Sequence, residues 1–226
     1  LRWTDEKKKA IRDSRILGTR NVVDAMSKLK KKPHTFIASS AIGFYGERGE
    51  EEVTESSAAG ENFLAGVCKE WEAESRRAED AGIRTVLLRT GIVLSKDGGA
   101  LATMLTPFKL GVGGVVGSGK QWMSWISLED EIAVINYVIE NENIRGAVNA
   151  VSPNPVTNEE FTKTLGAVLY RPTFLPLPEF AVSMIFGEMG DALLLASTKV
   201  MPKRLVDAGF EFKHPNLKEA IEKAVS

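Results

Sequence analysis

The sequence predicts an α/β fold in which a parallel sheet carries helices on both faces. Over the first 150 residues, stretches with helical apolar spacing alternate with short continuous apolar runs. The order helix, strand, helix, strand is typical of parallel sheets whose two faces are covered. The composition, 226 residues with 43% hydrophobic and 26% charged, is ordinary for one large globular domain or two small ones. Disordered, collagen-like and coiled-coil classes are excluded.

The first helix is predicted from Thr4 to about Lys32. Thr4 is a suitable N-cap, and the carboxylates of Asp5 and Glu6 favour the first turn of a helix. Apolar residues then recur at helical spacing, at Ile16, Val22, Val23, Met26 and Leu29. Pro33 ends the helix, and residues 35–38 form a short apolar run that predicts a buried strand followed by a polar loop.

A second helix and strand follow a polar loop over residues 47–60. Apolar residues from Phe63 to Ala78 predict the helix, and Ala81-Gly82 closes it. Residues 85–88 are continuously apolar after Thr85 and predict a second buried strand. Residues 101–108 then show the spacing of a short helix.

The second half continues the same alternation. Gly111 to Gly119 predicts a flexible loop, and residues 121–126 a strand. Ser127-x-x-Asp130 and Thr157-x-x-Glu160 have the capping-box pattern and predict two helix starts. Residues 147–151 predict a strand between these helices, and Asn216 precedes a last amphipathic helix.

Prolines punctuate the chain from Pro172 onward, so we place a domain boundary near residues 151–155. Residues 1–151 are expected to form the sheet domain, with residues 95–125 contributing a substrate loop. Residues 152–226 are expected to form a small, mainly helical domain.

Charge and cysteine content exclude several classes of protein. The formal net charge is -1, which argues against a general nucleic-acid binder. The most apolar stretch, residues 175–197, is interrupted by prolines and carboxylates and is too short to span a membrane. One cysteine and two histidines provide no disulfide and no zinc ligand set, so we expect no metal and a reducing, cytoplasmic location. The N-terminus has no signal-peptide pattern and is expected to be a cut end.

Polar residues follow both buried strands of the predicted sheet. Ser39 and Ser40 end the first strand, and Arg89-Thr90-Gly91 ends the second. Ligands of open α/β sheets bind outside the carboxyl ends of the strands, so these residues are candidates for a shared pocket. The alternative is that the serines only cap the next turn.

The glycine cluster over residues 111–119 is a weaker candidate. A phosphate-binding loop needs a strand before it and a helix after it, and this one follows a predicted helix. A mobile lid or substrate loop suits it better, with Ser118 and Gln121 as ligand candidates. Trp125, as an indole, is expected in the core.

Tyr45 lies one short loop beyond Ser40. A tyrosine that donates a proton near neutral pH needs a neighbouring cation to lower its pKa. No tyrosine in the chain has a lysine four residues later.

These residues resemble one atypical extended short-chain dehydrogenase/reductase family, named nucleoside-diphosphate-sugar epimerase-like or cell-division-inhibitor SulA-like. The resemblance spans nearly the whole chain. It is carried by the segments Arg2-Trp3-Thr4, Ser39-Ser40-Ala41-Ile42-Gly43-Phe44-Tyr45-Gly46, Phe63-Leu64-x-x-Val67-Cys68-x-x-Trp71-Glu72, Leu88-Arg89-x-Gly91-Ile92-Val93-Leu94, Gly113-Gly114-x-x-Gly117-Ser118-Gly119-x-Gln121, Trp125-Ile126 and Asn154-Pro155-Val156-Thr157-Asn158.

The resemblance implies a Rossmann-type domain that binds NADP(H), with NAD as the alternative, and a C-terminal domain over the substrate cleft. It implies catalytic roles for Ser40 and Tyr45. It implies cofactor contacts from Ser39, Arg89, Thr90, Gly91 and Ile92, and substrate contacts from Gly113, Gly114, Ser118, Gln121 and Trp125. It also implies that the chain lacks the family's N-terminal glycine-rich segment.

Two departures from the wider superfamily bear on activity. The helix that should carry Tyr-x-x-x-Lys has Phe63 and Val67 at those positions. Ser127 stands where relatives often carry histidine. Loss of a general acid costs about 10²–10⁴-fold in rate.

Three hypotheses follow. The first is an NADP(H)-binding epimerase or oxidoreductase that acts on a small molecule, with a nucleotide sugar as one candidate. The second is a non-catalytic, nucleotide-responsive regulator related to cell division. The third is a fragment without independent activity, whose open sheet edge could pair two copies into a homodimer.

Overall fold

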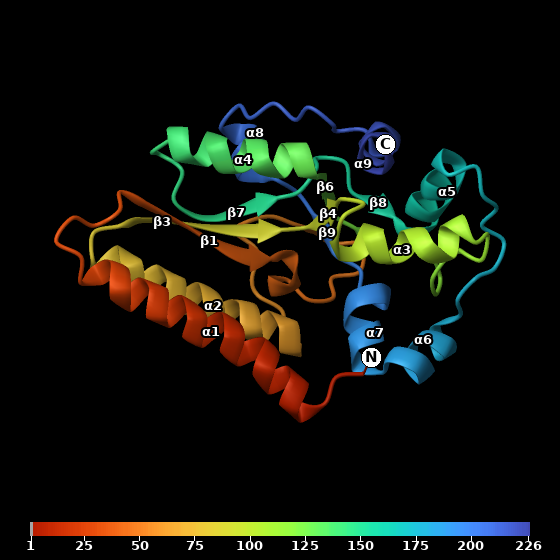
Figure 1. The fold of residues 1–226 in the computed structure, drawn as a ribbon, viewed down its shortest axis with the longest axis horizontal. Coiled ribbons are helices and arrows are strands. Elements are labelled where there is room, and N and C mark those ends of the chain that lie inside the picture. The colour runs from red at the N-terminus through yellow and green to blue at the C-terminus, as the bar shows by residue number, and fades with distance from the viewer. Residues whose placement is uncertain (1) are drawn as a thin grey trace.

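Three parallel strands form the main sheet in this computed structural model, which describes residues 2–226. Their order is β1 (Thr35–Ala41), β3 (Arg84–Thr90) and β7 (Gly146–Ala150). The helices α1 (Asp5–Ser27) and α2 (Phe63–Asp80) cover one face, and α4 (Leu128–Glu140) covers the other (Figure 1). The predicted fold class is confirmed.

The register brings the carboxyl ends of all three strands to one edge of the sheet. Ser40 lies opposite Arg89, and Arg89 lies opposite Asn149 on the next strand. Ala41 and Thr90 are paired one residue further along. The expectation that the turns after the two predicted strands meet at one rim is therefore confirmed.

Side-chain caps begin the helices where the sequence predicts them. Thr4 accepts a hydrogen bond from the Lys7 amide, and Thr157 accepts one from the Glu160 amide at the start of α5 (Asn158–Val168). Asn216 caps α9 (Leu217–Val225) in the same way. The first helix ends at Ser27 instead of near Lys32, because the lysine-rich turn beyond it has too few apolar residues to bury.

The capping box at Ser127 forms in one direction only. The Ser127 hydroxyl accepts a hydrogen bond from the Asp130 amide at 2.9 Å. The buried Asp130 carboxylate accepts from the Ser127 hydroxyl at 2.8 Å, not from the Ser127 amide, and it also accepts from the amides of Lys213 and His214. Asp130 thus holds the segment around Lys213 and His214 against α4.

Short strand pairs extend the structure beyond the main sheet. β4 (Ile92–Leu94) pairs with β6 (Trp125–Ser127), β5 (Trp122–Met123) with β8 (Val156–Thr157), and β2 (Glu52–Val53) with β9 (Lys199–Val200). The single strand predicted over residues 121–126 is divided at Ser124. The Ser124 hydroxyl there donates to the Thr198 carbonyl and accepts from the Val200 amide.

The remaining helices lie mostly in the second half of the chain. They are η1 (Ile42–Phe44), α3 (Gly99–Lys109), α6 (Glu179–Phe186), α7 (Glu188–Gly190), the π-helical turn η2 (Asp191–Leu195) and α8 (Lys203–Asp207). Residues after 152 also return to the first half, since β9 pairs with β2 and Leu205 packs in one cluster with Val86. The domain boundary near residues 151–155 stays a prediction.

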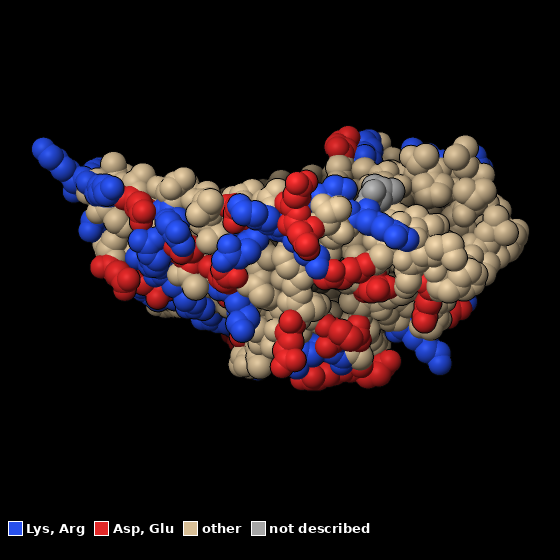
Figure 2. Space-filling model, turned by 90° about the horizontal axis from the view of Figure 1, so that it is seen from below, with Lys and Arg blue, Asp and Glu red and all other residues tan. Residues whose placement is uncertain are grey.

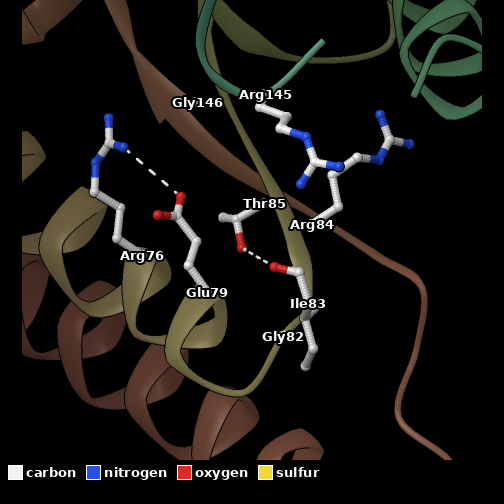
Figure 3. A pocket seen from close by; sticks show the side chains of 8 residues that line it. All are labelled: Arg76, Glu79, Gly82, Ile83, Arg84, Thr85, Arg145 and Gly146. Carbon is white, nitrogen blue, oxygen red and sulfur yellow. Dashed lines mark hydrogen bonds and ion pairs between the residues drawn. The ribbon is translucent and has the colours of Figure 1, made fainter. Parts of the chain in front are cut away.

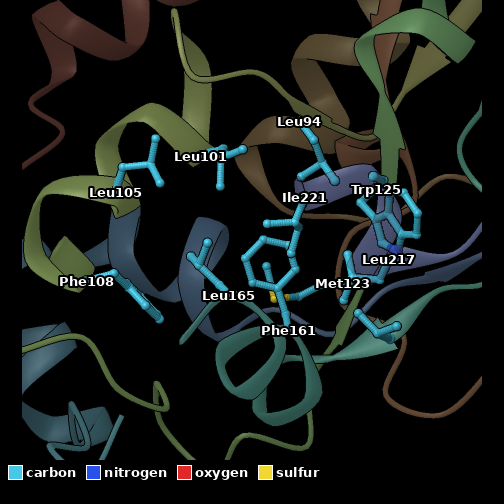
Figure 4. Close-up of a cluster of buried hydrophobic side chains, with 12 residues drawn as sticks. Leu94, Leu101, Leu105, Phe108, Met123, Trp125, Phe161, Leu165, Leu217 and Ile221 are labelled. Atoms are coloured by element: carbon cyan, nitrogen blue, oxygen red, sulfur yellow. The ribbon is translucent and has the colours of Figure 1, made fainter. Parts of the chain in front are cut away.

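The largest apolar cluster lies between α3, α5 and α9 (Figure 4). Its fully buried side chains include Leu101, Phe161, Leu165 and Ile221. This cluster anchors the elements that follow β4 onto the C-terminal helix. No helix within residues 2–226 is long and apolar enough to cross a bilayer.

Candidate active site at the carboxyl ends of the strands

A buried ion pair joins α2 to the end of β3. The Arg89 guanidinium donates two hydrogen bonds to the Glu72 carboxylate, each 2.8 Å long. Both residues are at most 4% exposed. Charges this deep stay ionised only when their partner and further hydrogen bonds compensate the loss of water.

Ser40 and Tyr45 complete the hydrogen bonding of this pair. The Ser40 hydroxyl donates to Glu72 Oε1 at 2.8 Å, and Arg89 Nη1 donates to the Tyr45 hydroxyl at 3.0 Å. Tyr45 in turn donates to Asn149 Oδ1 at 2.6 Å. The network therefore crosses all three strands of the sheet.

Both hydroxyl protons of this network point into the protein. Tyr45 is fully buried, and burial raises the pKa of its phenol despite the opposing effect of Arg89. Phe44 covers the network, because its ring centroid lies 3.4 Å from the Arg89 guanidinium carbon. The arrangement holds Ser40 and Tyr45 in fixed orientations, and their catalytic roles stay predictions.

The opposite face of the sheet carries a carboxyl group with a free oxygen. Ser39 and Thr90 alternate with Ser40 and Arg89 along their strands, so their side chains face α4. The Thr90 hydroxyl donates to Glu131 Oε1 at 2.9 Å. Glu131 Oε2 is buried and has no hydrogen-bond partner among residues 2–226.

Burial raises the pKa of Glu131 from its ordinary 4.5 to about 7, and the bond from Thr90 opposes this only in part. Glu131 thus changes charge near neutral pH at the rim where the strands end. Ser39 is exposed on the same face and has a free hydroxyl to offer.

Gly91 and Ile92 serve the packing of the chain after β3. A Cβ at Gly91 would lie 2.6 Å from the Ser124 carbonyl oxygen and 2.8 Å from a Val151 methyl group. Ile92 pairs with Trp125 in the next short sheet. Gly91 therefore allows close approach by the protein's own backbone, while cofactor contacts of these two residues stay predictions.

The glycine loop packs against the C-terminal half. Gly114 pairs with Phe174, and a Cβ at Gly114 would lie 1.8 Å from the Leu175 carbonyl oxygen. A Cβ at Gly113 would lie 2.5 Å from the Phe108 ring. The loop follows α3 and precedes β5, so it lacks the strand and helix that a phosphate-binding loop requires.

Gln121 ties this loop to the π-helical turn. Its Nε2 donates to the carbonyls of Val116 and Leu194, at 2.9 and 3.0 Å, while its Oε1 is buried without a partner among residues 2–226. The Ser118 hydroxyl accepts from the Lys120 amide. Trp125 is fully buried, and its indole N–H donates to the Asn154 carbonyl. Substrate contacts of these residues stay predictions.

Glu72, Asn149 and Glu131 are not among the residues predicted from the sequence. Glu72 had a signal, because it falls in the buried stripe of its helix with Ala65, Cys68, Ser75 and Ala78. A carboxylate at a core position of a helix requires a buried partner. Asn149 and Glu131 follow no such pattern, and only the packing of β7 and α4 reveals them.

Comparison with known proteins identifies the family of this chain. A sequence model described as the NAD dependent epimerase/dehydratase family matches residues 1–150. The chain belongs to this family. A second model, described as a domain of unknown function (DUF1731), matches residues 177–224.

Relatives of this epimerase-family chain occur in bacteria and animals. The epimerase family protein YfhF of Bacillus subtilis is 41% identical over 226 residues, which is 100% of this chain and 74% of the relative. The human epimerase family protein SDR39U1 is 34% identical over 226 residues, covering 100% of this chain and 77% of the human protein.

Two solved structures are similar to this epimerase-family chain. Human SDR39U1 (isoform 2), crystallised with NADPH, has a TM-score of 0.94 and 33% identity, over 100% of this chain and 77% of the human chain. A nucleoside-diphosphate sugar epimerase from Corynebacterium glutamicum has a TM-score of 0.79 and 35% identity, over 98% of this chain and 43% of that chain.

Removing the charge of Glu72 should destabilise the protein strongly. Glu72→Gln leaves Arg89 buried without a counter-charge, which costs about 3–5 kcal/mol. Glu70→Gln is the matched control, because Glu70 pairs with Arg12 on the exposed surface of the same helix and should change stability by about 1 kcal/mol or less. Urea unfolding measures both. Equal midpoints for the two variants would contradict the role assigned to the buried pair.

Glu131 should make stability depend on pH. Because its folded pKa is raised, the folded state binds the proton more tightly, and stability falls as the pH rises from about 4.5 to about 7. Glu131→Gln should remove this loss of about 3 kcal/mol, so the variant should be more stable than the native chain above pH 7 and match it near pH 4. Thermal unfolding at several pH values measures the difference. Parallel pH profiles for the two proteins would refute the assignment.

Proposed function

We propose that this epimerase-family chain binds the nicotinamide end of NADP(H) at the carboxyl ends of β1 and β3 and acts on a small-molecule substrate there. The observation that carries the proposal is the free, buried oxygen of Glu131, held beside Thr90 at the rim where the two strands end. Ligands of open α/β sheets bind at such rims. NADPH is also the ligand named with the human SDR39U1 structure.

The residues at the rim suit the nicotinamide carboxamide. Its amino group can donate to Glu131 Oε2, and its carbonyl can accept from the exposed Ser39 hydroxyl. The glycine loop does not suit a pyrophosphate, because Gly113 and Gly114 are packed against Phe108 and Leu175. The described residues therefore support binding of the nicotinamide end of the cofactor.

A bound nicotinamide cofactor supplies hydride transfer. The chain's own residues then orient the ligand and hold protons. Glu131, with a pKa of about 7, can hold or release a proton at Oε2. The hydroxyl groups of Ser40 and Tyr45 donate hydrogen bonds to Glu72 and Asn149. Tyr45 can therefore serve as a proton donor only after its hydrogen bond to Asn149 is broken.

The finer assignments belong to the same proposal. A nucleotide sugar is the proposed substrate, in line with the name of the similar Corynebacterium glutamicum protein. A reducing, cytoplasmic location suits the single cysteine, since Cys68 is buried and burial raises its pKa to about 11. We also propose a homodimer that forms through the unpaired edge of β1. A monomer mass measured by light scattering would exclude this dimer.

A nucleotide-responsive binding protein without turnover is the second candidate. Phe63 and Val67 stand where the superfamily has its tyrosine and lysine, and the two remaining hydroxyls both donate inward. Turnover of a nucleotide sugar or carbonyl substrate would exclude this candidate. A role in cell division stays a prediction.

NADPH titration followed by fluorescence tests the cofactor. Thr90→Val removes the hydroxyl that orients Glu131 and should weaken NADPH binding by about tenfold, the effect of about 1.4 kcal/mol. Thr103→Val is the matched control, because the Thr103 hydroxyl bonds only to its own helix on the exposed side of α3. Equal affinity for both variants would rule out the rim as the nicotinamide site. NADP and NAD are compared in the same assay.

Tyr45→Phe tests the proton donor. If Tyr45 donates the proton, the variant should lose about 10²–10⁴-fold of NADPH-dependent reduction while NADPH affinity is kept. Thermal unfolding of the variant is measured alongside, because the variant loses two buried hydrogen bonds of the Tyr45 hydroxyl, and each partner left unsatisfied costs about 1–3 kcal/mol. Unchanged turnover in a folded variant would end this role for Tyr45.

A further inference from the structure

A groove runs along the free edge of β7, on the side of the sheet that α2 covers. It consists of two adjoining cavities of about 430 and 460 Å³. Both are lined by Arg76 of α2 and by Gly146 at the start of β7. The first cavity, shown in Figure 3, lies at the amino-terminal ends of β3 and β7. Glu131 lies at the other end of the sheet, beside Thr90.

The lining of this edge groove is strongly basic. Cations outnumber carboxylates two to one: Arg76, Arg84, Arg89, Arg145, Lys203 and Arg204 against Glu55, Glu79 and Asp207. Arg84 and Arg89 belong to the wall, because the first donates to carbonyls at the end of α4 and the second is paired with Glu72. Lys203 is paired with Asp207 at 2.8 Å, so three cations of the lining remain for a ligand: Arg76, Arg145 and Arg204.

Two of these cations have no carboxylate partner within residues 2–226. Arg204 donates to the carbonyl oxygens of Arg145 and Ala147, which are neutral acceptors and leave its charge uncompensated. The Arg145 side chain is exposed and forms no ion pair in the described part of the chain. Arg76 is only loosely paired, with 3.7 Å between its Nη1 and Glu79 Oε1.

Arg76 and Arg204 converge at Gly146. A Cβ built on Gly146 would lie 3.8 Å from Nη1 of each guanidinium. Glycine leaves this space open, and its φ of 71° favours glycine there on backbone grounds as well. Two guanidinium groups so close repel each other unless an anion lies between them.

We propose that the edge groove binds a small ligand with a phosphate monoester or diphosphate group, seated over Gly146 between Arg76 and Arg204 and contacted by the exposed Arg145. Planar guanidinium groups from separate elements match the several oxygens of a phosphate. The surplus of positive charge in the lining suits an anion with two or three charges. A carboxylate would leave part of that charge uncompensated.

The surroundings favour a small ligand over a nucleic acid. The face formed by α1 and α2, seen from below in Figure 2, mixes basic and acidic side chains and has no continuous basic track. The ion pairs between Arg20 and Glu74 and between Arg77 and Asp24 lie on these two helices. A phosphate backbone needs a longer run of unpaired cations than this face provides.

Calorimetric titration of the whole chain with inorganic pyrophosphate tests the proposal. Arg145→Gln and Arg76→Gln should each weaken binding by tenfold or more, and higher salt should weaken it further. Both side chains are on the surface, so these variants should have the same unfolding temperature as the native chain. Arg12→Gln, which removes an exposed arginine from α1, should bind like the native chain.

Any of the following results would overturn the proposal: no pyrophosphate binding at millimolar concentration, equal affinity in the native chain and Arg145→Gln, or tighter binding of a single-stranded oligonucleotide that Arg145→Gln abolishes. A competition experiment between NADPH and pyrophosphate identifies the source of the phosphate. NADPH fluorescence should be unchanged at saturating pyrophosphate. Displacement of NADPH would assign the groove to the cofactor's own pyrophosphate and also overturn the proposal. Failure here leaves the Thr90 test of the nicotinamide site unaffected.

Discussion

The buried ion pair between Glu72 and Arg89 is the interaction on which the rest of the structure depends. It ties α2 to the middle strand at the point where that strand ends. Ser40 on β1 and, through Tyr45, Asn149 on β7 complete its hydrogen bonds. Because a buried charge tolerates no missing partner, the three strand ends must keep this register. The network therefore fixes the relative positions of the three strand ends.

This constraint separates the two faces of the sheet. On the α2 face, the polar groups satisfy one another and serve architecture. On the α4 face, Glu131 keeps one oxygen free and a pKa near neutrality, so that face retains groups for a ligand. The free edge of β7 is closed by side chains, since Glu55 accepts from the Asn149 amide and Arg204 donates to the Ala147 carbonyl. Such closure protects an edge strand from pairing with another chain.

Local patterns predicted most of the regular structure. Caps such as Thr4, Thr157 and Asn216 satisfy amides within the next three residues, so the sequence alone locates them. The two-residue strands β2 and β9 carry no such signal, because their pairing joins residues nearly 150 positions apart. The glycine loop was misleading for the same reason. Its glycines suggested mobility, yet residues 174–175 lie against them and require the missing side chains.

The sequence by itself determined the fold class, the family and the strands that end in polar residues, since these depend on apolar spacing and on motifs read along the chain. Only the tertiary structure decided which of those polar residues are free. Ser39 and Ser40 are neighbours in sequence, but Ser40 donates to a buried carboxylate whereas Ser39 faces solvent. Likewise, Arg76 and Arg204 are far apart in the chain and meet at Gly146 only after folding. Desolvation and charge pairing depend on distances in space, and no spacing along a sequence contains them.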